Sequence, residues 1–557
     1  MIANPIYTPL TLYNGFSADL PLRDSIVSDE RVEDVVYNEV YFNGRETSEG
    51  RVLIYGILAR HDDGKKHSAI LIIPDLEDKT DIQLMNIYVR LGYDVLLIDY
   101  KGETESTDNY TNYPSDIKYA NLKYSELNFD RVPRSARETC RYEWTCVASY
   151  AISFLKARLE TNKIGVLGVK YGAEIMWHLV SMDNRITCAV ALFGAGWRAY
   201  KGTDKFSSDR MGEIDEERIR FIAGVDSHSF APYCKCPVAL LTSTNSTTFD
   251  ADRAHDTIRR VNPKVSTLFC FSPRMRDALD INCTRNSELF FGAFLSGQRI
   301  VRPSEPQLSF KVIPGGVRVE VAVGSEVKTR NLRIYLCEGQ TIPSWRNWVT
   351  LNATLENDKY VAEYSCVNGG GLMFAFAVAE YRNGITVSTG IIPCKCPISD
   401  IIRTNLIYSN TEGLGDFVCD TDPKDMIANV LYYKNSPLIV KRGPMNISGV
   451  SSKSGLISYK PNEKCVQVKT DSIFKLDVYC NSPVTLVASI GVSLGCENEL
   501  IYSCSVDVPE GEVWQNVVLY IKDFKSQDGK LITDFDEVVY IGFKSDGFFA
   551  INNVLFL

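Results

Sequence analysis

Histidine is scarce in this sequence: the chain has 557 residues but only five histidines, and none follows His255. Imidazole is the usual general base at neutral pH, because its unperturbed pKa lies close to physiological pH. Chemistry that needs a histidine base is therefore restricted to the N-terminal part of the chain, and the remaining 302 residues, 256–557, cannot supply one.

Long apolar runs are also missing. No stretch approaches the roughly 18 uninterrupted apolar residues of a membrane-spanning helix. The first twenty residues, MIANPIYTPLTLYNGFSADL, lack the basic start and apolar run of a signal peptide. We therefore expect a cytoplasmic protein with no membrane partner, in which the 16 cysteines are reduced thiols.

Clustered basic residues are lacking as well. The net charge is −9 at pH 7, and no basic stripe is present, which argues against a nucleic-acid partner. The string CKCP occurs twice, at 234–237 and 394–397. Four thiolates could bind zinc, but Cys-x-Cys is less typical of such sites than Cys-x-x-Cys, and we expect strand-edge positions in different domains. We predict no metal and no cofactor.

Short apolar stretches alternate with helical patterns from about residue 30 to 298. Strand-like examples are HSAILIIP (67–74), YDVLLIDYKG (93–102) and KIGVLG (163–168). This alternation predicts β-α-β units and a doubly wound, mostly parallel α/β sheet covered by helices on both faces. A charged segment, 198–233, interrupts the series, and insertions of this kind often form lids.

The helical patterns nearly vanish after RPSEP (302–306). Alternating apolar and polar residues between turn residues then predict all-β structure. We expect three domains: an α/β domain over 1–300, an immunoglobulin-like β-sandwich over 301–398, and a jelly roll over 399–557.

One strand–turn–helix pattern carries most of the functional argument. In IGVLGVKYGAEIMWHL (164–179), Gly168 and Gly172 lie two positions either side of Lys170. The same spacing occurs in the Gly-x-Ser-x-Gly nucleophile elbow, whose strained middle residue is the catalytic serine. Here that position is a lysine.

The N-terminal region resembles a known family in the order and the amino-acid sequence of several stretches. They are YVRLGYDVLLIDYKGETES (88–106), YPSDIKYANL (113–122), KIGVLGVKYGAEIMWHL (163–179) and CPVALLTSTN (236–245). The family is that of α/β-hydrolases of the acetylxylan esterase/cephalosporin-C deacetylase and dienelactone hydrolase kind. The resemblance implies an α/β-hydrolase fold over about 30–298. The following β regions look like the sandwich and galactose-binding-like jelly roll of some relatives.

The catalytic residues that this resemblance implies are all replaced. The nucleophile falls on Lys170, and the triad acid falls on Ser246. The triad histidine should lie within FSPRMRDALD (271–280), where Arg276 stands nearest to its place. The loop that supplies the oxyanion hole carries Asp75 and Glu77, whose carboxylates oppose a developing negative charge.

Alternatives remain open for several residues. Lys170 could be a desolvated amine nucleophile, or a lysine paired with Asp75, Glu77 or Asp277. His228, in the lid-like insertion, is an alternative acid–base. A second Gly-x-Ser-x-Gly string, 491–495, lies in the all-β region, and we interpret it as a turn between strands.

We expect a pseudoenzyme: a degenerate carbohydrate-esterase-like hydrolase that binds a carbohydrate or small acylated ligand, or that partners an active paralogue. Candidate ligand-binding residues are Lys170, Tyr171, His228 and Trp514, the last because aromatic faces stack on sugar rings. Two alternatives are an active ester hydrolase or deacetylase that uses non-standard residues, and a structural subunit of a homo-oligomer or other assembly.

Overall fold

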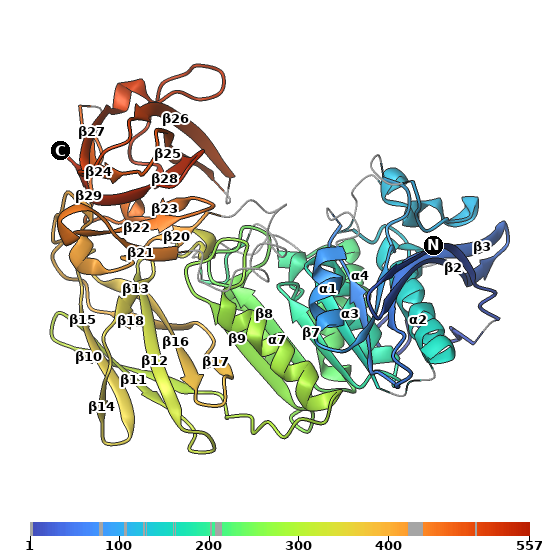
Figure 1. The fold of residues 1–557 in the computed structure, drawn as a ribbon. Helices are drawn as coiled ribbons and strands as arrows, with labels where there is room; N and C mark the ends of the chain where they lie inside the picture. The colour runs from blue at the N-terminus through green and yellow to red at the C-terminus, as the bar shows by residue number, and fades with distance from the viewer. Residues whose placement is uncertain are drawn as a thin grey trace.

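The N-terminal half of the protein is built on one nine-stranded sheet, seen in a computed structural model (Figure 1). The structure describes residues 4–19, 21–76, 82–104, 108–125, 129, 131–159, 161, 163–200, 203–206, 214–420, 438–469, 471–495 and 498–557. The strand order is β1-β2-β3-β5-β4-β6-β7-β8-β9. The strands are β1 (Ser25–Val32), β2 (Val35–Thr47), β3 (Gly50–His61), β4 (Ala69–Ile73), β5 (Asp94–Ile98), β6 (Ile164–Val169), β7 (Cys188–Leu192), β8 (Val238–Ser243) and β9 (Thr267–Ser272).

Six neighbouring strands, from β5 to β9 in that order, run parallel, whereas β1, β2 and β3 pair antiparallel at one edge. The parallel strands are buried on both faces, and β4 reads AILII with every residue inside. A continuous apolar run of this kind needs helices on both sides of the sheet. The predicted fold class, a mostly parallel α/β sheet followed by antiparallel β-sheet domains, is confirmed.

Helices cover both faces of this sheet. One core joins the sheet to α1 (Ile82–Arg90) and α7 (Ile281–Phe294). A second core, on the opposite face, joins it to α2 (Cys140–Leu159), α3 (Tyr171–Met182) and α6 (Ala251–Arg259). The insertion contributes the short helices α4 (Glu216–Gly224) and α5 (Ser227–Phe230). No helix in the described ranges combines the length and hydropathy that crossing a membrane requires.

Two antiparallel sheets follow α7. They have the orders β10-β11-β15-β14 and β13-β12-β16-β17, and β18 pairs with β16. The strands are β10 (Gln307–Ile313), β11 (Gly316–Ala322), β12 (Thr329–Glu338), β13 (Val349–Leu351), β14 (Thr354–Glu356), β15 (Lys359–Ser365), β16 (Gly371–Tyr381), β17 (Thr386–Ser388) and β18 (Ile392–Cys396).

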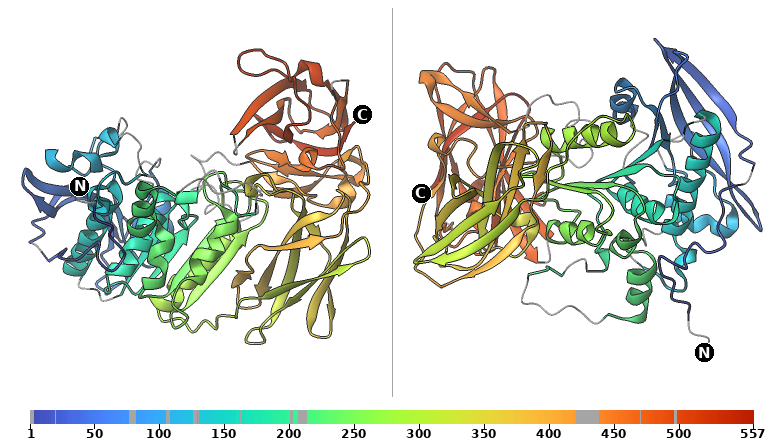
Figure 2. Two further views of the ribbon diagram at one scale, coloured as in Figure 1. Left: turned by 180° about the vertical axis from the view of Figure 1, so that it is seen from behind. Right: turned by 90° about the horizontal axis from the view of Figure 1, so that it is seen from below.

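The last part of the chain forms another pair of antiparallel sheets, β21-β22-β29-β24-β27 and β20-β23-β28-β25-β26, with β19 paired to β29. The strands are β19 (Leu406–Tyr408), β20 (Val418–Cys419), β21 (Leu438–Arg442), β22 (Ser448–Ser452), β23 (Leu456–Ser458), β24 (Ile473–Tyr479), β25 (Val484–Gly495), β26 (Asn498–Val508), β27 (Gln515–Tyr520), β28 (Val538–Ser545) and β29 (Ala550–Phe556). Both β regions lie at one end of the molecule (Figures 1 and 2). The exact limits 1–300, 301–398 and 399–557 stay a prediction.

The second Gly-x-Ser-x-Gly string is not a turn, so that interpretation was wrong. Residues 491–495 are the last five of β25, paired with β26 through Gly491 and Ser493. A Cβ at Gly491 would come 2.1 Å from the ring of Tyr540 on β28. The glycine is there because an aromatic ring lies against the strand.

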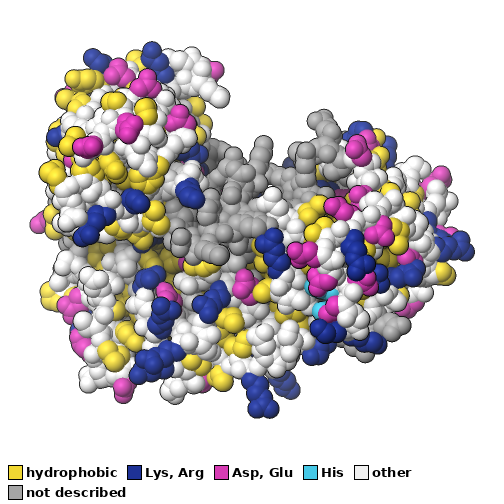
Figure 3. Space-filling view, in the orientation of Figure 1, with side chains coloured by type: hydrophobic (Ala, Val, Ile, Leu, Met, Phe, Trp, Pro, Cys, Tyr) yellow, Lys and Arg dark blue, Asp and Glu magenta, His cyan; other side chains and the backbone are white. Residues whose placement is uncertain are grey.

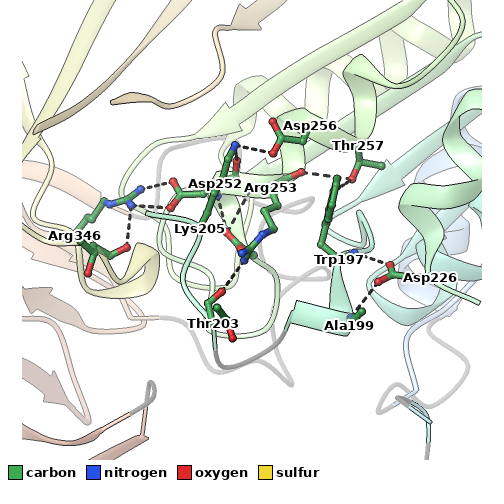
Figure 4. Close-up of polar contacts among 12 residues, drawn as sticks. Trp197, Ala199, Thr203, Lys205, Asp226, Asp252, Arg253, Asp256, Thr257 and Arg346 are labelled. Atoms are coloured by element: carbon green, nitrogen blue, oxygen red, sulfur yellow. Dashed lines mark hydrogen bonds and ion pairs between the residues drawn. The ribbon is translucent and has the colours of Figure 1, made fainter. Parts of the chain in front are cut away.

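One buried ion pair docks the sandwich on the α/β domain (Figure 4). Arg346 donates to both oxygens of Asp252, in the first turn of α6, at 2.5 and 2.7 Å, and neither side chain is exposed. The guanidinium also lies 3.8 Å from the centre of the Phe374 ring. Asn245 reinforces the contact, since its Nδ2 donates to the Arg346 carbonyl at 2.8 Å.

We expect Asp252→Ala to lower the free energy of unfolding by about 3–5 kcal/mol, because it leaves the buried Arg346 charge without its counter-ion. The double variant Asp252→Ala/Arg346→Met should recover most of that loss. Urea denaturation followed by circular dichroism measures both. As a control, Arg31→Met breaks the exposed pair with Asp62 and should barely move the midpoint. A double variant no better than the single one would contradict this account.

Candidate functional site

The elbow geometry is intact although the serine is absent. Lys170 joins β6 to α3 with φ 48° and ψ −110°, a backbone conformation that residues with a Cβ rarely adopt. A Cβ at Gly172 would lie 2.1 Å from the carbonyl oxygen of Ile73, and one at Gly168 would lie 2.5 Å from the Cα of Ala173. Only glycine fits at both places, so the spacing follows from the packing of α3 against the sheet.

The Lys170 ammonium is buried beside a carboxylate. Its Nζ lies 3.3 Å from Oδ2 of Asp75, which follows β4, and both side chains are about 5 % exposed. Oδ1 of Asp75 accepts from the Leu76 N–H at 2.8 Å and lies 3.4 Å from the backbone nitrogen of Tyr171. Lys101 fixes this loop, because its Nζ donates to the carbonyl of Leu76 at 3.0 Å. Glu77 lies outside the described residues.

These contacts have a direct chemical meaning. In an elbow hydrolase, the oxyanion hole is formed by the N–H of the residue after the nucleophile and an N–H from the loop after a neighbouring strand. Here the corresponding donors, Tyr171 and Leu76, face the Asp75 carboxylate. A fixed negative charge thus stands where a hydrolase stabilises a transient one.

Ser246, at the triad-acid position, contacts Asp277, which lies in the segment 271–280 where the triad histidine was expected. The contact is a hydrogen bond between a hydroxyl and a carboxylate. Ser246 Oγ donates to Asp277 Oδ1 at 2.8 Å, and Thr247 Oγ1 donates to Oδ2 at 2.6 Å. Ser246 Oγ in turn accepts from the Phe249 N–H at 3.1 Å. This arrangement organises the turn that leads into α6.

Arg276, predicted to stand nearest to the place of the triad histidine, contacts the last β region. Its guanidinium points away from Ser246 and lies 3.5 Å from Asp420 and 3.3 Å from Glu499, both in the last β region. Burial alone would lower the pKa of Arg276, but nearby tyrosines and these two carboxylates raise it instead. Asp277, the next residue, is the one that meets Ser246.

Aromatic and charged side chains pack around Tyr171, the residue after the elbow lysine. The Arg198 guanidinium lies 4.3 Å from the centre of its ring, and the Phe249 ring centre lies 6.3 Å away. Arg198 Nε is 3.0 Å from Glu174 Oε1, and Arg141 pairs with the other oxygen of the same carboxylate. A neighbouring pocket of about 60 Å³ is lined by Ser246, Phe249 and the start of the insertion, and Lys170 is not among its lining residues.

The insertion is tied to α6 (Figure 4). Trp197 Nε1 donates to Thr257 Oγ1 at 2.8 Å, Lys205 Nζ lies 2.6 Å from Asp256, and Arg253 donates to the Thr203 carbonyl at 2.9 Å. The described part of the insertion is therefore held against the domain by polar contacts.

His228 belongs to this anchoring. Its ring stacks on Trp197 with centres 3.9 Å apart, and its Nδ1 lies 3.1 Å from Asp226. Asp226 also accepts from the backbone N–H of Trp197 and of Ala199. Burial would raise the pKa of Asp226, but the contact with His228 and these N–H groups lower it.

The other four histidines contact partners elsewhere: His61 contacts Asp94, His67 contacts Asp63, His178 contacts Tyr13, and His255 contacts Glu305.

Trp514 lies in the last β region, near Tyr479 at 5.9 Å between ring centres, and its ring packs where Cβ atoms at Gly443 and Gly449 would be. The four residues proposed for ligand binding thus do not form one site. Lys170 and Tyr171 are adjacent, His228 anchors the insertion, and Trp514 lies on another domain.

The two CKCP strings lie on different sheets, one before β8 and one in β18. Across the described ranges, no three histidine, cysteine, aspartate or glutamate side chains are placed to hold a metal. Basic and acidic side chains are interspersed on the face drawn in Figure 3.

The chain was compared with protein families, curated sequences and solved structures. No protein-family model matches the sequence, and no similar sequence is found among curated proteins. Acetyl xylan esterase 1 from Thermoanaerobacterium sp. JW/SL YS485 has 12% identity and TM-score 0.39, covering 53% of this chain and 94% of that one. An acetyl xylan esterase from Paenibacillus sp. R4 has 14% identity and TM-score 0.40, covering 53% and 96%. A protein described as a dienelactone hydrolase from Klebsiella pneumoniae has 10% identity and TM-score 0.33, covering 47% and 99%.

At these values the fold assignment rests on the chain itself. The parallel strand order, the helices on both faces and the strained elbow between β6 and α3 are those of an α/β-hydrolase. The N-terminal half of this protein has the α/β-hydrolase fold.

His178 gives a pH test of its place in the core. Its Nε2 donates to the Val225 carbonyl at 2.6 Å, Nδ1 accepts from Tyr13, and burial lowers its pKa from 6.5 to about 3. Because the unfolded chain binds a proton below 6.5 and the folded one does not, this group's stability contribution falls as pH falls from about 6.5 toward 3.

We expect His178→Gln to be less stable than wild type at neutral pH, since it weakens the contacts with Val225 and Tyr13. The difference should shrink by about 2 kcal/mol at about pH 5, where only the wild type loses stability through this histidine. Denaturant titrations at both pH values measure the gap. A constant gap would mean that His178 titrates normally in the folded protein.

Proposed function

We propose that the protein is a catalytically degenerate, esterase-like α/β-hydrolase that acts by binding rather than by hydrolysis. The observation that carries this proposal is the Asp75–Lys170 pair at the elbow. An ammonium beside a carboxylate lacks the free lone pair that a nucleophile needs. The same carboxylate faces the donors that would otherwise stabilise an oxyanion.

The size of the expected loss supports this view. Removing one oxyanion-hole donor costs about 10²–10³ in rate, and removing a triad nucleophile or base costs about 10⁶. Here the nucleophile, acid and base positions carry Lys170, Ser246 and Arg276, and the Asp75 carboxylate faces the donors of the oxyanion hole. Neither Ser246 nor Asp277 has a histidine as a hydrogen-bond partner among the described residues.

We infer that its ligand is a carbohydrate or a small acylated molecule, and that it works in the cytoplasm. The cluster of Trp514, Tyr479 and Phe548 favours a carbohydrate, because aromatic faces offer an apolar surface to a sugar ring. Association with an active hydrolase, or with further copies of the chain, is compatible with a protein that binds and does not cleave.

The wild-type protein should release no p-nitrophenol from p-nitrophenyl acetate above the rate in buffer, and Lys170→Ala should leave this unchanged. Absorbance of p-nitrophenolate over hours measures both. Lys264→Ala, at an exposed position, is the matched control. Turnover that Lys170→Ala abolishes and Lys264→Ala keeps would overturn the proposal in favour of an active ester hydrolase.

A carbohydrate role for the aromatic cluster predicts retention on an insoluble polysaccharide. We expect the full chain to sediment with xylan or cellulose and Trp514→Ala to lose about tenfold in affinity, as removal of one well-packed aromatic contact does. Tyr520→Ala, which removes an exposed ring on β27, is the control. Equal sedimentation of both variants would assign Trp514 a packing role only.

A further inference from the structure

A small cavity lies between the β-sandwich and the last β region. Its volume is about 210 Å³. Its walls come from the end of β12 with the loop after it, from the loop between β15 and β16, and from the segment after β23. We call it the amide cavity, and we define it by Trp345, Asn347, Asn368, Tyr459, Asn462 and Glu463.

On the residues that line it, four buried polar atoms make no hydrogen bond in the described part of the chain. They are Asn347 Oδ1, Asn368 Nδ2, the Tyr459 hydroxyl and Asn462 Nδ2. Each such group costs about 1–3 kcal/mol when left unpaired, so buried polar groups are almost always satisfied. Three of the four belong to asparagine amides that line one cavity, which favours an occupant able to form hydrogen bonds.

Neighbouring contacts fix how two of these amides point. Asn347 Nδ2 donates to Asp416 at 2.7 Å and to Glu463 at 2.8 Å, which leaves its oxygen as the unpaired atom. Asn368 Oδ1 accepts from the Cys465 N–H at 2.9 Å, which leaves its nitrogen unpaired. The cavity therefore offers at least one acceptor and one donor from positions that cannot simply rotate.

The charges around the cavity disfavour an ionic ligand. Glu338 already accepts from the N–H groups of Val367, Asn368 and Gly370 and from the Tyr364 hydroxyl. Burial raises the pKa of Glu463 to about 7, so it is partly neutral at physiological pH. Lys464, the one basic side chain on the described wall, is exposed.

The amide cavity adjoins a larger one. A cavity of about 910 Å³ shares Asn347 and Glu463 with it. Its walls combine aromatic and apolar side chains with the charged side chains of Arg274, Arg333, Glu412, Asp416 and Lys460. A ligand held in the amide cavity can therefore extend into a wider space whose walls are partly apolar and partly polar.

We propose that the amide cavity binds a neutral polyhydroxylated ligand, a mono- or disaccharide, with hydroxyl groups hydrogen-bonded to Asn347, Asn368 and Asn462. A hydroxyl both donates and accepts, so one ring can satisfy an amide oxygen and two amide nitrogens together. This inference rests on the proposed function in taking the protein as a binder. It concerns a site remote from the elbow, and ester turnover alone would leave it standing.

The test is calorimetric titration of the full chain with glucose, galactose, xylose, cellobiose and xylobiose, and with the charged sugars glucosamine and glucuronate. At least one neutral sugar should bind with a Kd of about 1 mM or tighter, and the charged sugars should bind at least about tenfold more weakly. Hydrogen exchange should show protection of the backbone around 337–347 and 459–465 on binding.

Matched variants locate the site. Asn368→Asp keeps the oxygen that accepts from the Cys465 N–H and replaces the unpaired amide nitrogen with a carboxylate oxygen. Asn462→Asp likewise replaces an unpaired amide nitrogen with an oxygen, at a half-buried position. Both should weaken binding about tenfold, as expected for the loss of one hydrogen bond. Asn446→Asp, at an exposed turn of the same domain, should bind like wild type. Thermal melts confirm that each variant is folded.

Three outcomes would overturn the proposal. The first is that no neutral sugar binds at about 20 mM, which would make this a cavity for ordered water only. The second is sugar binding that Asn462→Asp leaves unchanged and that protects neither backbone segment. The third is a preference for glucosamine or glucuronate. If Asn368→Asp does not fold, Asn462→Asp and the wild-type exchange data still decide.

Discussion

The elbow of the α/β domain is built around one buried ion pair. Asp75 and Lys170 come from loops after two adjacent parallel strands, and both are buried. Lys170 has a backbone conformation that costs about 1–3 kcal/mol. That strain survives without catalysis because α3 must pass close to the Ile73 carbonyl, which Gly172 permits. The packing of α3 against the sheet thus accounts for the shape of the elbow, and the Lys170 and Asp75 side chains lie against each other there.

Much of the fold could be predicted from sequence because its signal is local. The run AILII of β4 is buried on both faces, and such runs occur where helices flank a parallel sheet. The two glycines around Lys170 likewise predicted the strained turn. The Gly-x-Ser-x-Gly string at 491–495 led to a wrong prediction of a turn. There, Gly491 lies inside a strand and leaves room for the ring of Tyr540. Glycine spacing alone does not distinguish these causes.

The site was less predictable because it depends on side-chain direction and on contacts distant in sequence. Arg276 and Asp277 are neighbours, yet one points to the last β region and the other to Ser246. Nothing in the sequence decides between them until the position of Asp420 is known. The Arg346–Asp252 pair joins residues 94 positions apart. Nothing in the sequence distinguishes this arginine and this aspartate from the others in the chain.

The loop after β9 connects the α/β domain to the last β region. In hydrolases of this fold it carries the catalytic histidine, which must stay free to move protons. Here Arg274 donates to the Gly415 carbonyl, Met275 bridges to Cys419, and Arg276 meets Asp420. The loop is therefore fixed to the last β region at three successive residues. The contacts that hold the last β region in place thus come from the segment where hydrolases of this fold carry their histidine. Under the binding function that we propose, recognition of a ligand falls to the surfaces and cavities that the β regions create.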